Sequence, residues 1–198
     1  PDGENLLAHR VIVAIGRSGN FRKLGVSGED LDKVSNRLHD PKDFCDQNVL
    51  IVGGGDSALE TAIALATCGA RVTLSYRKET FSRPKPENVE KIRMLQEDPM
   101  AEDAVVEEPS SERVTTATSG FLNEHRKAGT LSLMMASRTK EIRESEVIIT
   151  DRDGQNQVVA NDAVFAMIGR EAPLDFFRRS GVAIRGEWVV RPWVGLGV

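Results

Sequence analysis

Cysteine is scarce in this sequence: its 198 residues include only Cys45 and Cys68, which are far apart and form no Cys-x-x-Cys arrangement. Structural zinc sites and dithiol redox centres both need closely spaced ligands or thiols. We therefore predict neither a metal site nor a redox dithiol in this chain. Cys68 ends an apolar stretch and is expected in the core, and Cys45 is expected to be an ordinary reduced thiol.

Long apolar runs and a strong net charge are also lacking. No stretch approaches the roughly 20 apolar residues that cross a bilayer, and the N-terminus does not resemble a signal peptide, so we expect a cytoplasmic protein without a membrane partner. The net charge is −4, and residues 96–113 hold seven acidic residues and one basic residue. With aromatic residues at 5% and no mixed basic and aromatic cluster, we predict no nucleic-acid partner.

Glycine, in contrast, is concentrated at one informative place. An apolar strand over Val49–Val52 runs into Gly53-Gly54-Gly55-Asp56-Ser57-Ala58, a G-x-G-x-x-A turn. Gly53 allows a sharp turn, Gly55 removes the Cβ that would block a phosphate, and Ala58 lets the next helix pack closely on the strand. This pattern predicts a site for the pyrophosphate of a dinucleotide. The alternative is a strand-to-helix turn with incidental glycines.

The sequence after the turn has the order of a strand–helix–strand unit. An amphipathic helix is expected over Asp56–Cys68, followed by a strand over Arg71–Tyr76. The start of such a helix offers free N–H groups and a partial positive charge to an anion. We expect Asp56 and Ser57 to cap this helix, with Asp56 turned away from the phosphate and Ser57 able to donate to it.

Basic residues follow the second strand, where a dinucleotide's 2′ position is recognised. Arg77, Lys78 and Arg83 occupy the place where an NAD-preferring site would put an acid. Charged donors there suit a 2′-phosphate, so we predict NADPH, with NADH as the alternative. Glu79 adds a competing acid. A solvated basic turn without a ligand would show the same residues.

The rest of the chain is predicted from periodicity and turn residues. We expect a linker over 18–46, a helix from Pro86 to about Gln96, a mobile acidic excursion over 96–120, a short helix at 121–127, strands at 130–136, 139–143, 147–150, 157–159 and 163–168, a helix at 175–179 and an extended segment at 187–191. The strands between 139 and 159 suggest a small antiparallel meander. Two similar strands, Val11–Arg17 and Val164–Arg170, bracket the nucleotide unit.

These features together resemble the nicotinamide-nucleotide domain of thioredoxin-reductase-like flavoproteins of the pyridine nucleotide-disulfide oxidoreductase family. The match rests on Gly53–Glu60, on Tyr76-Arg77-Lys78 with Arg83, and on the bracketing strands that end at Gly16 and Gly169. The resemblance implies that Tyr76 belongs to the cofactor site and that Glu60 and Gly169 lie near the nicotinamide. Glu60 could instead be a helix-surface carboxylate that pairs with a neighbour.

The resemblance also implies a fold class and a division of the chain. We expect an α/β Rossmann-type three-layer domain with a parallel sheet, helices on both faces and an appended antiparallel meander. Residues 1–46 would be an FAD-domain remnant with a crossover linker, 47–170 the NAD(P)H-binding domain, and 171–198 a return crossover with a second FAD-domain remnant. The family's FAD fingerprints and its dithiol are absent from this sequence, so it is expected to be a fragment that is inactive alone.

The function expected from the resemblance is hydride delivery from NADPH to FAD held by the missing part of the polypeptide, with no catalytic side chain in this segment. The final electron acceptor is unknown, and a homodimer is compatible with the sequence. Two alternatives stay open. One is the NADPH domain of a flavin-dependent monooxygenase, which also favours a Gly-x-Gly-x-Ser pattern, and the other is a nucleotide-sensing module without catalysis.

Overall fold

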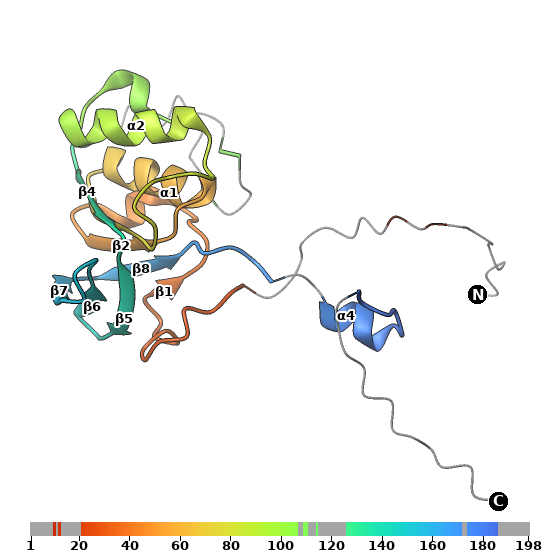
Figure 1. Cartoon of the computed structure of the whole chain (residues 1–198). Helices are drawn as coiled ribbons and strands as arrows, with labels where there is room; N and C mark the ends of the chain where they lie inside the picture. Colours follow the sequence, from red (N-terminus) through yellow and green to blue (C-terminus); the bar gives the residue numbers. More distant parts are fainter. Residues whose placement is uncertain are drawn as a thin grey trace, which may run out of the picture. The chain divides into compact units, whose positions relative to one another are not determined.

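Figure 1 shows a computed structural model of the chain, which describes residues 10, 12, 21–106, 109–110, 114, 126–171 and 174–185. Its contacts define two units, Phe21–Gly169 on the one hand and the chain ends Pro1–Asn20 with Arg170–Val198 on the other. The strand expected at Val11–Arg17, most of the helix expected at 121–127 and the segment 187–191 fall outside the described residues.

The described elements follow one another in the order expected for an α/β domain. In chain order they are β1 (Val34–Ser35), η1 (Pro41–Phe44), β2 (Asn48–Val52), α1 (Asp56–Thr67), β3 (Arg71–Tyr76), α2 (Pro86–Glu97), η2 (Glu102–Ala104), β4 (Thr130–Met135), β5 (Arg138–Ile142), β6 (Glu146–Thr150), β7 (Asn156–Ala160), β8 (Ala163–Ala166) and α4 (Leu174–Arg179). Most predicted elements are present within one or two residues of these bounds. The exceptions are β1, η1 and η2, which lie in segments predicted as a linker and an excursion.

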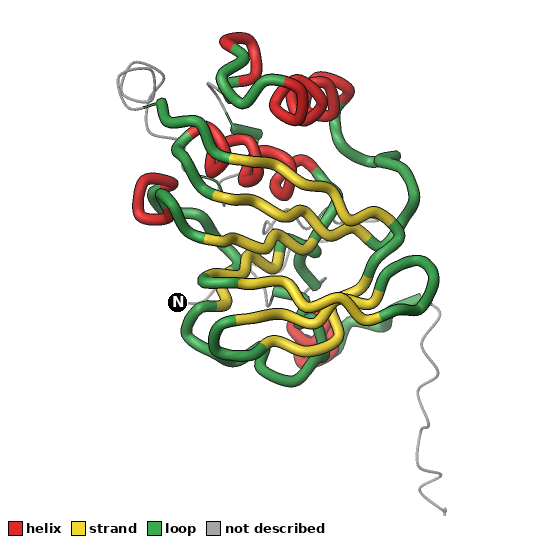
Figure 2. Tube along the Cα trace, turned by 90° about the vertical axis from the view of Figure 1, so that its left-hand side faces the viewer, coloured by secondary structure: helices red, strands yellow, loops and turns green. Residues whose placement is uncertain are grey.

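A parallel sheet forms the centre of the unit Phe21–Gly169. Its strand order is β1-β8-β2-β3-β4, and every neighbouring pair is parallel. The strands run side by side in Figure 2. The predicted return of the chain to this sheet is confirmed, because β8 pairs with β2 in the register Val52 to Ala166. The carboxyl ends of β2, β3 and β8 therefore meet at one edge.

Different layers cover the two faces of this sheet. Val49 and Ile51 pack in one apolar cluster with α1 and α2, whereas Leu50 and Val52 pack in a second cluster with β5 and β6. Successive side chains of a strand point to opposite faces, so the helices lie on one side and the antiparallel sheet β5-β6-β7 on the other (Figure 1). The prediction of helices on both faces is wrong for the described residues, because the meander supplies the third layer.

The acidic stretch 96–120 was expected to leave the body of the domain. Its described residues include three apolar side chains that are almost fully buried in the helical-side core, Ala104, Val106 and Val114. Lys91 of α2 also donates to the Val105 carbonyl at 2.8 Å. These contacts anchor the described part of the stretch against the helices.

Candidate nucleotide-binding site

The turn between β2 and α1 begins at a position that only glycine can occupy. Gly53 has a φ of +153°, and a Cβ there would lie 2.6 Å from the Met167 carbonyl oxygen and 3.1 Å from the Ala58 Cβ. Its N–H donates to the Ser75 carbonyl of β3 at 3.0 Å. The turn is thus packed against the ends of β3 and β8, and the small side chain of Ala58 is required for the same packing.

The middle glycine, Gly54, was not assigned a role from the sequence. A Cβ on Gly54 would come within 2.2–2.5 Å of three ring atoms of Tyr76. The Tyr76 ring is 7% exposed and stacks on Phe81, with ring centroids 5.4 Å apart. The Tyr76 ring therefore packs against the turn at Gly54. The sequence did not predict this contact.

Gly55 precedes α1 and borders open space. Apart from its chain neighbours, no heavy atom of the described residues lies within 4 Å of an ideal Cβ at this position, although its φ of −117° would allow any residue. Within the described residues, the N–H groups of Gly55, Asp56 and Ser57 have no acceptor. The start of α1 therefore combines room, free donors and the positive end of the helix dipole, as the sequence predicted for an anion site.

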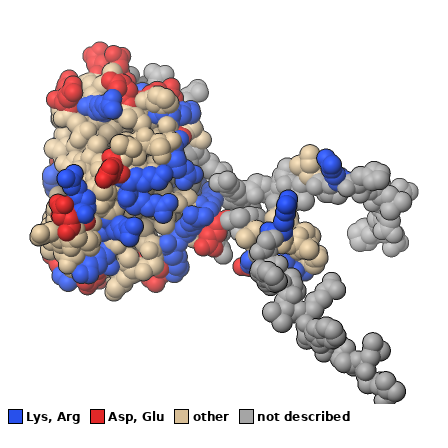
Figure 3. Space-filling model, in the orientation of Figure 1, with Lys and Arg blue, Asp and Glu red and all other residues tan. Residues whose placement is uncertain are grey.

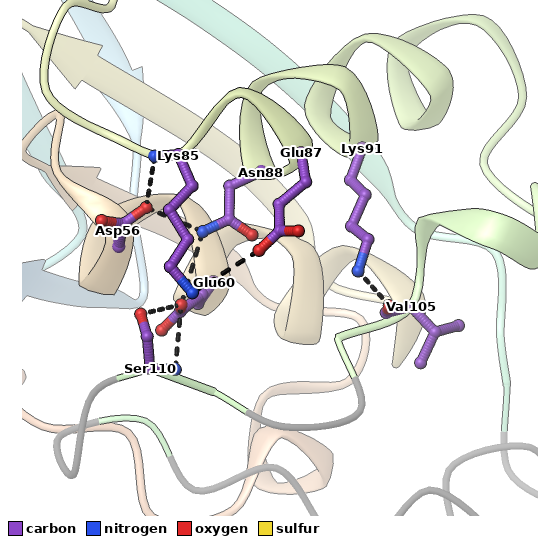
Figure 4. Close-up of polar contacts among 8 residues, drawn as sticks. All are labelled: Asp56, Glu60, Lys85, Glu87, Asn88, Lys91, Val105 and Ser110. Carbon is purple, nitrogen blue, oxygen red and sulfur yellow. Dashed lines mark hydrogen bonds and ion pairs between the residues drawn. The ribbon is translucent and has the colours of Figure 1, made fainter.

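Asp56 does not cap α1, so this part of the prediction is wrong. Its carboxylate accepts hydrogen bonds from the Lys85 N–H at 2.7 Å and from the Asn88 side chain at 2.9 Å. Lys85 is the residue that precedes α2, so Asp56 supplies the missing cap of the neighbouring helix (Figure 4). The carboxylate faces α2 rather than the first turn of α1, which agrees with the expectation that it turns away from a phosphate.

Glu60 is buried, with only 2% of its surface exposed. The interpretation of Glu60 as a helix-surface carboxylate is therefore wrong. Its Oε1 accepts from the Ser110 N–H at 3.0 Å, from the Ser110 hydroxyl and from the Asn88 side chain at 3.4 Å, whereas its Oε2 has no partner among the described residues (Figure 4). Asn88 is itself 3% exposed and bonds both Asp56 and Glu60. The sequence did not predict the hydrogen bonds among Glu60, Asn88 and Ser110. The only signal was that Glu60 and Asn88 are polar residues with apolar neighbours in the sequence.

The predicted basic residues follow β3 in the loop that leads to α2. Arg77, Lys78 and Arg83 are exposed, and none has an ion pair within the part of the chain that the structure describes. Lys78 donates a long hydrogen bond of 3.4 Å to the Ser82 hydroxyl. These cations are free to meet an anionic group.

Gly169 lies at the same edge of the sheet as the glycine turn. It is three residues beyond β8, has a φ of +99°, and has open space where a Cβ would be. Met167, two residues earlier, carries the carbonyl oxygen that faces Gly53. The structure thus brings together the glycine turn, Ser57 and Gly169 at one edge of the parallel sheet. Glu60 instead contacts Ser110 of the acidic stretch 96–120.

Neither cysteine is part of this edge. The Cys45 thiol donates to the Cys68 carbonyl oxygen at 2.7 Å, and both thiols are free. Burial, followed by the nearby Cys45, raises the pKa of the Cys68 thiol to about 11. Cys68 is fully buried, as predicted.

Comparison with known proteins identifies relatives over most of the chain. The profile of the family described as pyridine nucleotide-disulphide oxidoreductase matches residues 2–105. A ferredoxin–NADP reductase of Ignicoccus hospitalis is 29% identical over 91% of this chain and 50% of the relative. Bacilliredoxin reductase Bdr of Bacillus subtilis is 27% identical over 89% of this chain and 45% of the relative.

Solved structures show the same fold. Bacillithiol disulfide reductase Bdr from Bacillus cereus superimposes with a TM-score of 0.65 at 25% identity, covering 85% of this chain and 43% of that protein. Thioredoxin reductase from Lactococcus lactis gives a TM-score of 0.59 at 21% identity, covering 86% and 48%. This chain spans about half the length of these relatives.

The comparisons confirm the predicted resemblance to thioredoxin-reductase-like enzymes and the α/β fold class. At the level of the family they also agree with the predicted cofactors, NADPH and FAD. Among the described residues, no helix is long and apolar enough to span a membrane. With half of its residues matched by the family profile and its glycine turn built as the motif requires, this chain belongs to the pyridine nucleotide-disulphide oxidoreductase family.

Proposed function

We propose that this chain is the NADPH-binding domain of a two-dinucleotide flavoprotein oxidoreductase and serves FAD held elsewhere in the polypeptide. The observation that carries the proposal is the turn Gly53–Gly55. Two of its glycines are required by atoms already present, and the third opens onto free space before α1. Packing within the protein does not explain why Gly55 is glycine, because nothing there would meet a Cβ. A close ligand does explain it.

The pyrophosphate of the dinucleotide is the group we place at this turn. The free N–H groups of Gly55, Asp56 and Ser57 donate to its oxygens, and the dipole of the 12-residue helix α1 adds a favourable field. The Asp56 carboxylate does not oppose the phosphate, because Lys85 and Asn88 hold it toward α2.

The 2′-phosphate is assigned to the basic loop after β3. Arg77, Lys78 and Arg83 are exposed and unpaired within the described residues, so little must be broken before they meet an anion. A hydrogen bond to a charged group contributes about 1.5–3 kcal/mol. Two such bonds are enough for a preference of at least roughly tenfold for NADPH over NADH, which lacks the phosphate.

The nicotinamide end is assigned to the side of the edge where Gly169 lies. Gly169 leaves open space beside the turn, and Glu60 acts as a positioning residue through Asn88 and Ser110. When bound, NADPH supplies a hydride from nicotinamide C4 that FAD accepts at N5. The protein's own contribution is to bind and orient the dinucleotide, since we assign no side chain of this chain to a chemical step.

The names of the relatives each specify a separate redox partner, ferredoxin in one case and bacilliredoxin in the other. We propose that the full protein likewise exchanges electrons with a separate redox partner. Both names are those of reductases, which favours this function over the monooxygenase and sensing alternatives.

The test is a calorimetric titration of the 198-residue chain with NADPH and with NADH, repeated for Arg77→Ala. We expect the parent to bind NADPH at least about tenfold more tightly than NADH. Arg77→Ala should lose much of that preference while NADH binding stays unchanged. Equal affinity for both nucleotides, or an unchanged preference in the variant, would contradict the basic loop as the 2′-phosphate site. No binding of either nucleotide would contradict the proposed function of this chain.

A further inference from the structure

Some basic side chains of this protein have an acidic partner. Within the described residues, ion pairs join Lys23 to Glu29 and Asp30, Lys42 to Asp40, Lys85 to Glu87, Arg93 to Glu90, Lys127 to Asp46, Arg143 to Glu141 and Glu146, Arg152 to Asp153, and Arg178 to Asp175. Arg138, the first residue of β5, has no such partner in the same set. The same holds for Arg77, Lys78 and Arg83, and for further exposed cations such as Arg71 and Lys140.

Arg138 is 61 residues beyond Arg77 in the sequence but is held beside the same loop. After β4 the chain turns at Ala136, whose φ is +51°. The Ala136 N–H then donates to the Lys78 carbonyl and the Ser137 N–H donates to the Tyr76 carbonyl, both at 3.0 Å. Two backbone hydrogen bonds therefore tie the residues before Arg138 to the residues on either side of Arg77.

Side chains reinforce this connection from inside the protein. The hydroxyl groups of Ser75 and Ser137 lie 2.8 Å apart, and the two residues are 1% and 2% exposed. A buried, mutually satisfied pair of hydroxyl groups holds its surroundings in one arrangement. Arg138 itself is exposed and begins β5, where it pairs with Thr150 of β6; the β5–β6 register shifts farther along, between Thr139 and Glu141. The backbone at Arg138 is consequently held by its pairing with β6 and by the hydrogen bonds of the two residues before it.

On the face of the unit Phe21–Gly169 that Figure 3 shows, Lys and Arg side chains gather toward the middle and lower part. A phosphate monoester carries nearly two negative charges and three acceptor oxygens, and guanidinium groups match it with paired donors. A guanidinium carried on a paired strand costs less backbone freedom on binding than one carried on a loop. Glu79, an acid in the same loop, weakens the attraction of Arg77 and Lys78 for an anion, and a further cation nearby offsets this effect.

We infer that Arg138 is a specificity-determining residue that binds the 2′-phosphate of the dinucleotide together with the basic loop after β3. This inference rests on the proposed function, since it deepens the nucleotide preference of the same site. A dinucleotide without the 2′-phosphate presents only a ribose hydroxyl there, so Arg138 contributes to the affinity for NADPH and not to that for NADH.

The experiment compares Arg138→Ala with the parent in titrations with NADPH, NADH and 2′,5′-ADP. We expect the dissociation constants for NADPH and 2′,5′-ADP to rise about tenfold, the effect of losing one charge-assisted contact, and the constant for NADH to stay the same. Arg93→Ala is the control, because it removes another exposed arginine, one that lies on α2 and pairs with Glu90. It should leave all three constants unchanged.

The outcomes separate this inference from the proposed function. If Arg77→Ala loses the NADPH preference but Arg138→Ala keeps it, the inference is overturned and the proposed function stands. An equal loss of NADPH and NADH affinity in Arg138→Ala would also overturn the inference, since it would mean a general effect on the site. A parent chain that binds none of the three ligands would overturn both. Should Arg138→Ala fail to fold, Arg138→Gln keeps the side-chain stem and gives the same comparison.

Discussion

The Tyr76 ring lies against Gly54 so closely that a Cβ on Gly54 would be 2.2 Å from the ring's Cε2 atom. Tyr76 ends β3, and Gly54 is the middle residue of the turn after β2. The contact joins the two places where the nucleotide is proposed to bind, because the basic loop starts at the residue after Tyr76. The Tyr76 ring also stacks on Phe81.

Replacing Gly54 by alanine is therefore expected to destabilise the fold. The buried ring would have to move, and overpacking of this kind costs about 1–3 kcal/mol. The matched control is Gly55→Ala, where the added methyl meets open space. Thermal or denaturant unfolding should show a lower stability for Gly54→Ala and almost none of this loss for Gly55→Ala.

Gly55→Ala, the control for stability, is expected to affect nucleotide binding. We expect Gly55→Ala, although stable, to bind NADPH much more weakly, because its methyl group occupies the space proposed for the pyrophosphate. Titration calorimetry measures this directly. Undiminished affinity in Gly55→Ala would argue that the pyrophosphate does not approach this residue.

Asp56 is expected to matter for stability more than for binding. Asp56→Ala removes the acceptor for the Lys85 N–H and for Asn88, and loss of a helix cap costs about 0.5–2 kcal/mol. Asp56→Asn keeps one acceptor oxygen and should recover part of the loss. Denaturant unfolding of the two variants checks the order, which would be reversed if the negative charge opposed folding.

Acid is expected to destabilise the protein partly through Asp162. Its carboxylate accepts from the Asn48 N–H at 2.7 Å and from the Asn48 side chain at 3.0 Å. The backbone hydrogen bond from Asn48 is the main cause that lowers the pKa of Asp162 below the ordinary value of an aspartate. A carboxyl whose pKa is lower in the folded state stabilises the fold above its unfolded pKa, and the contribution is lost as the pH falls through the folded pKa.

The corresponding variant is Asp162→Asn, measured by urea unfolding between neutral pH and about pH 3. At neutral pH it should be less stable than the parent, and the difference should shrink below about pH 4, the unfolded pKa of an aspartate, as the pH falls toward the lower folded pKa. A constant difference across this range would show that the charge of Asp162 does not contribute.

The two thiols should differ in reactivity in the folded chain. Cys68 is fully buried and its pKa is raised to about 11, so it holds almost no thiolate at pH 8. Cys45 is partly exposed. A thiol reagent at pH 8 should label Cys45 first and reach Cys68 only after unfolding, which mass spectrometry of peptides can follow. Early labelling of Cys68 would contradict its burial.

Local signals in the sequence determined a large part of this protein. Apolar runs, turn glycines and the proline that starts α2 predicted β2, α1, β3 and α2 within one or two residues, because these signals depend on neighbours in the chain. The glycine spacing also predicted the open space at Gly55 and the close packing of Ala58.

Tertiary structure alone decided the features that depend on residues distant in the sequence. β1 is two residues long, and it exists only because it pairs with β8. The meander covers the second face of the sheet because its apolar side chains alternate toward Leu50 and Val52. Periodicity along a strand says which residues share a face but does not say which element will cover that face.

The site shows the same division. Its residue types were evident from the sequence, but three of their surroundings were not: Tyr76 beneath Gly54, Asp56 at the start of α2, and Glu60 buried beside Ser110. Arg138 gave no signal, since nothing in the sequence relates it to Arg77. The N–H groups of Ala136 and Ser137 donate to the Lys78 and Tyr76 carbonyls and so place Arg138 beside the loop that carries Arg77. Such hydrogen bonds form only when the strands assemble.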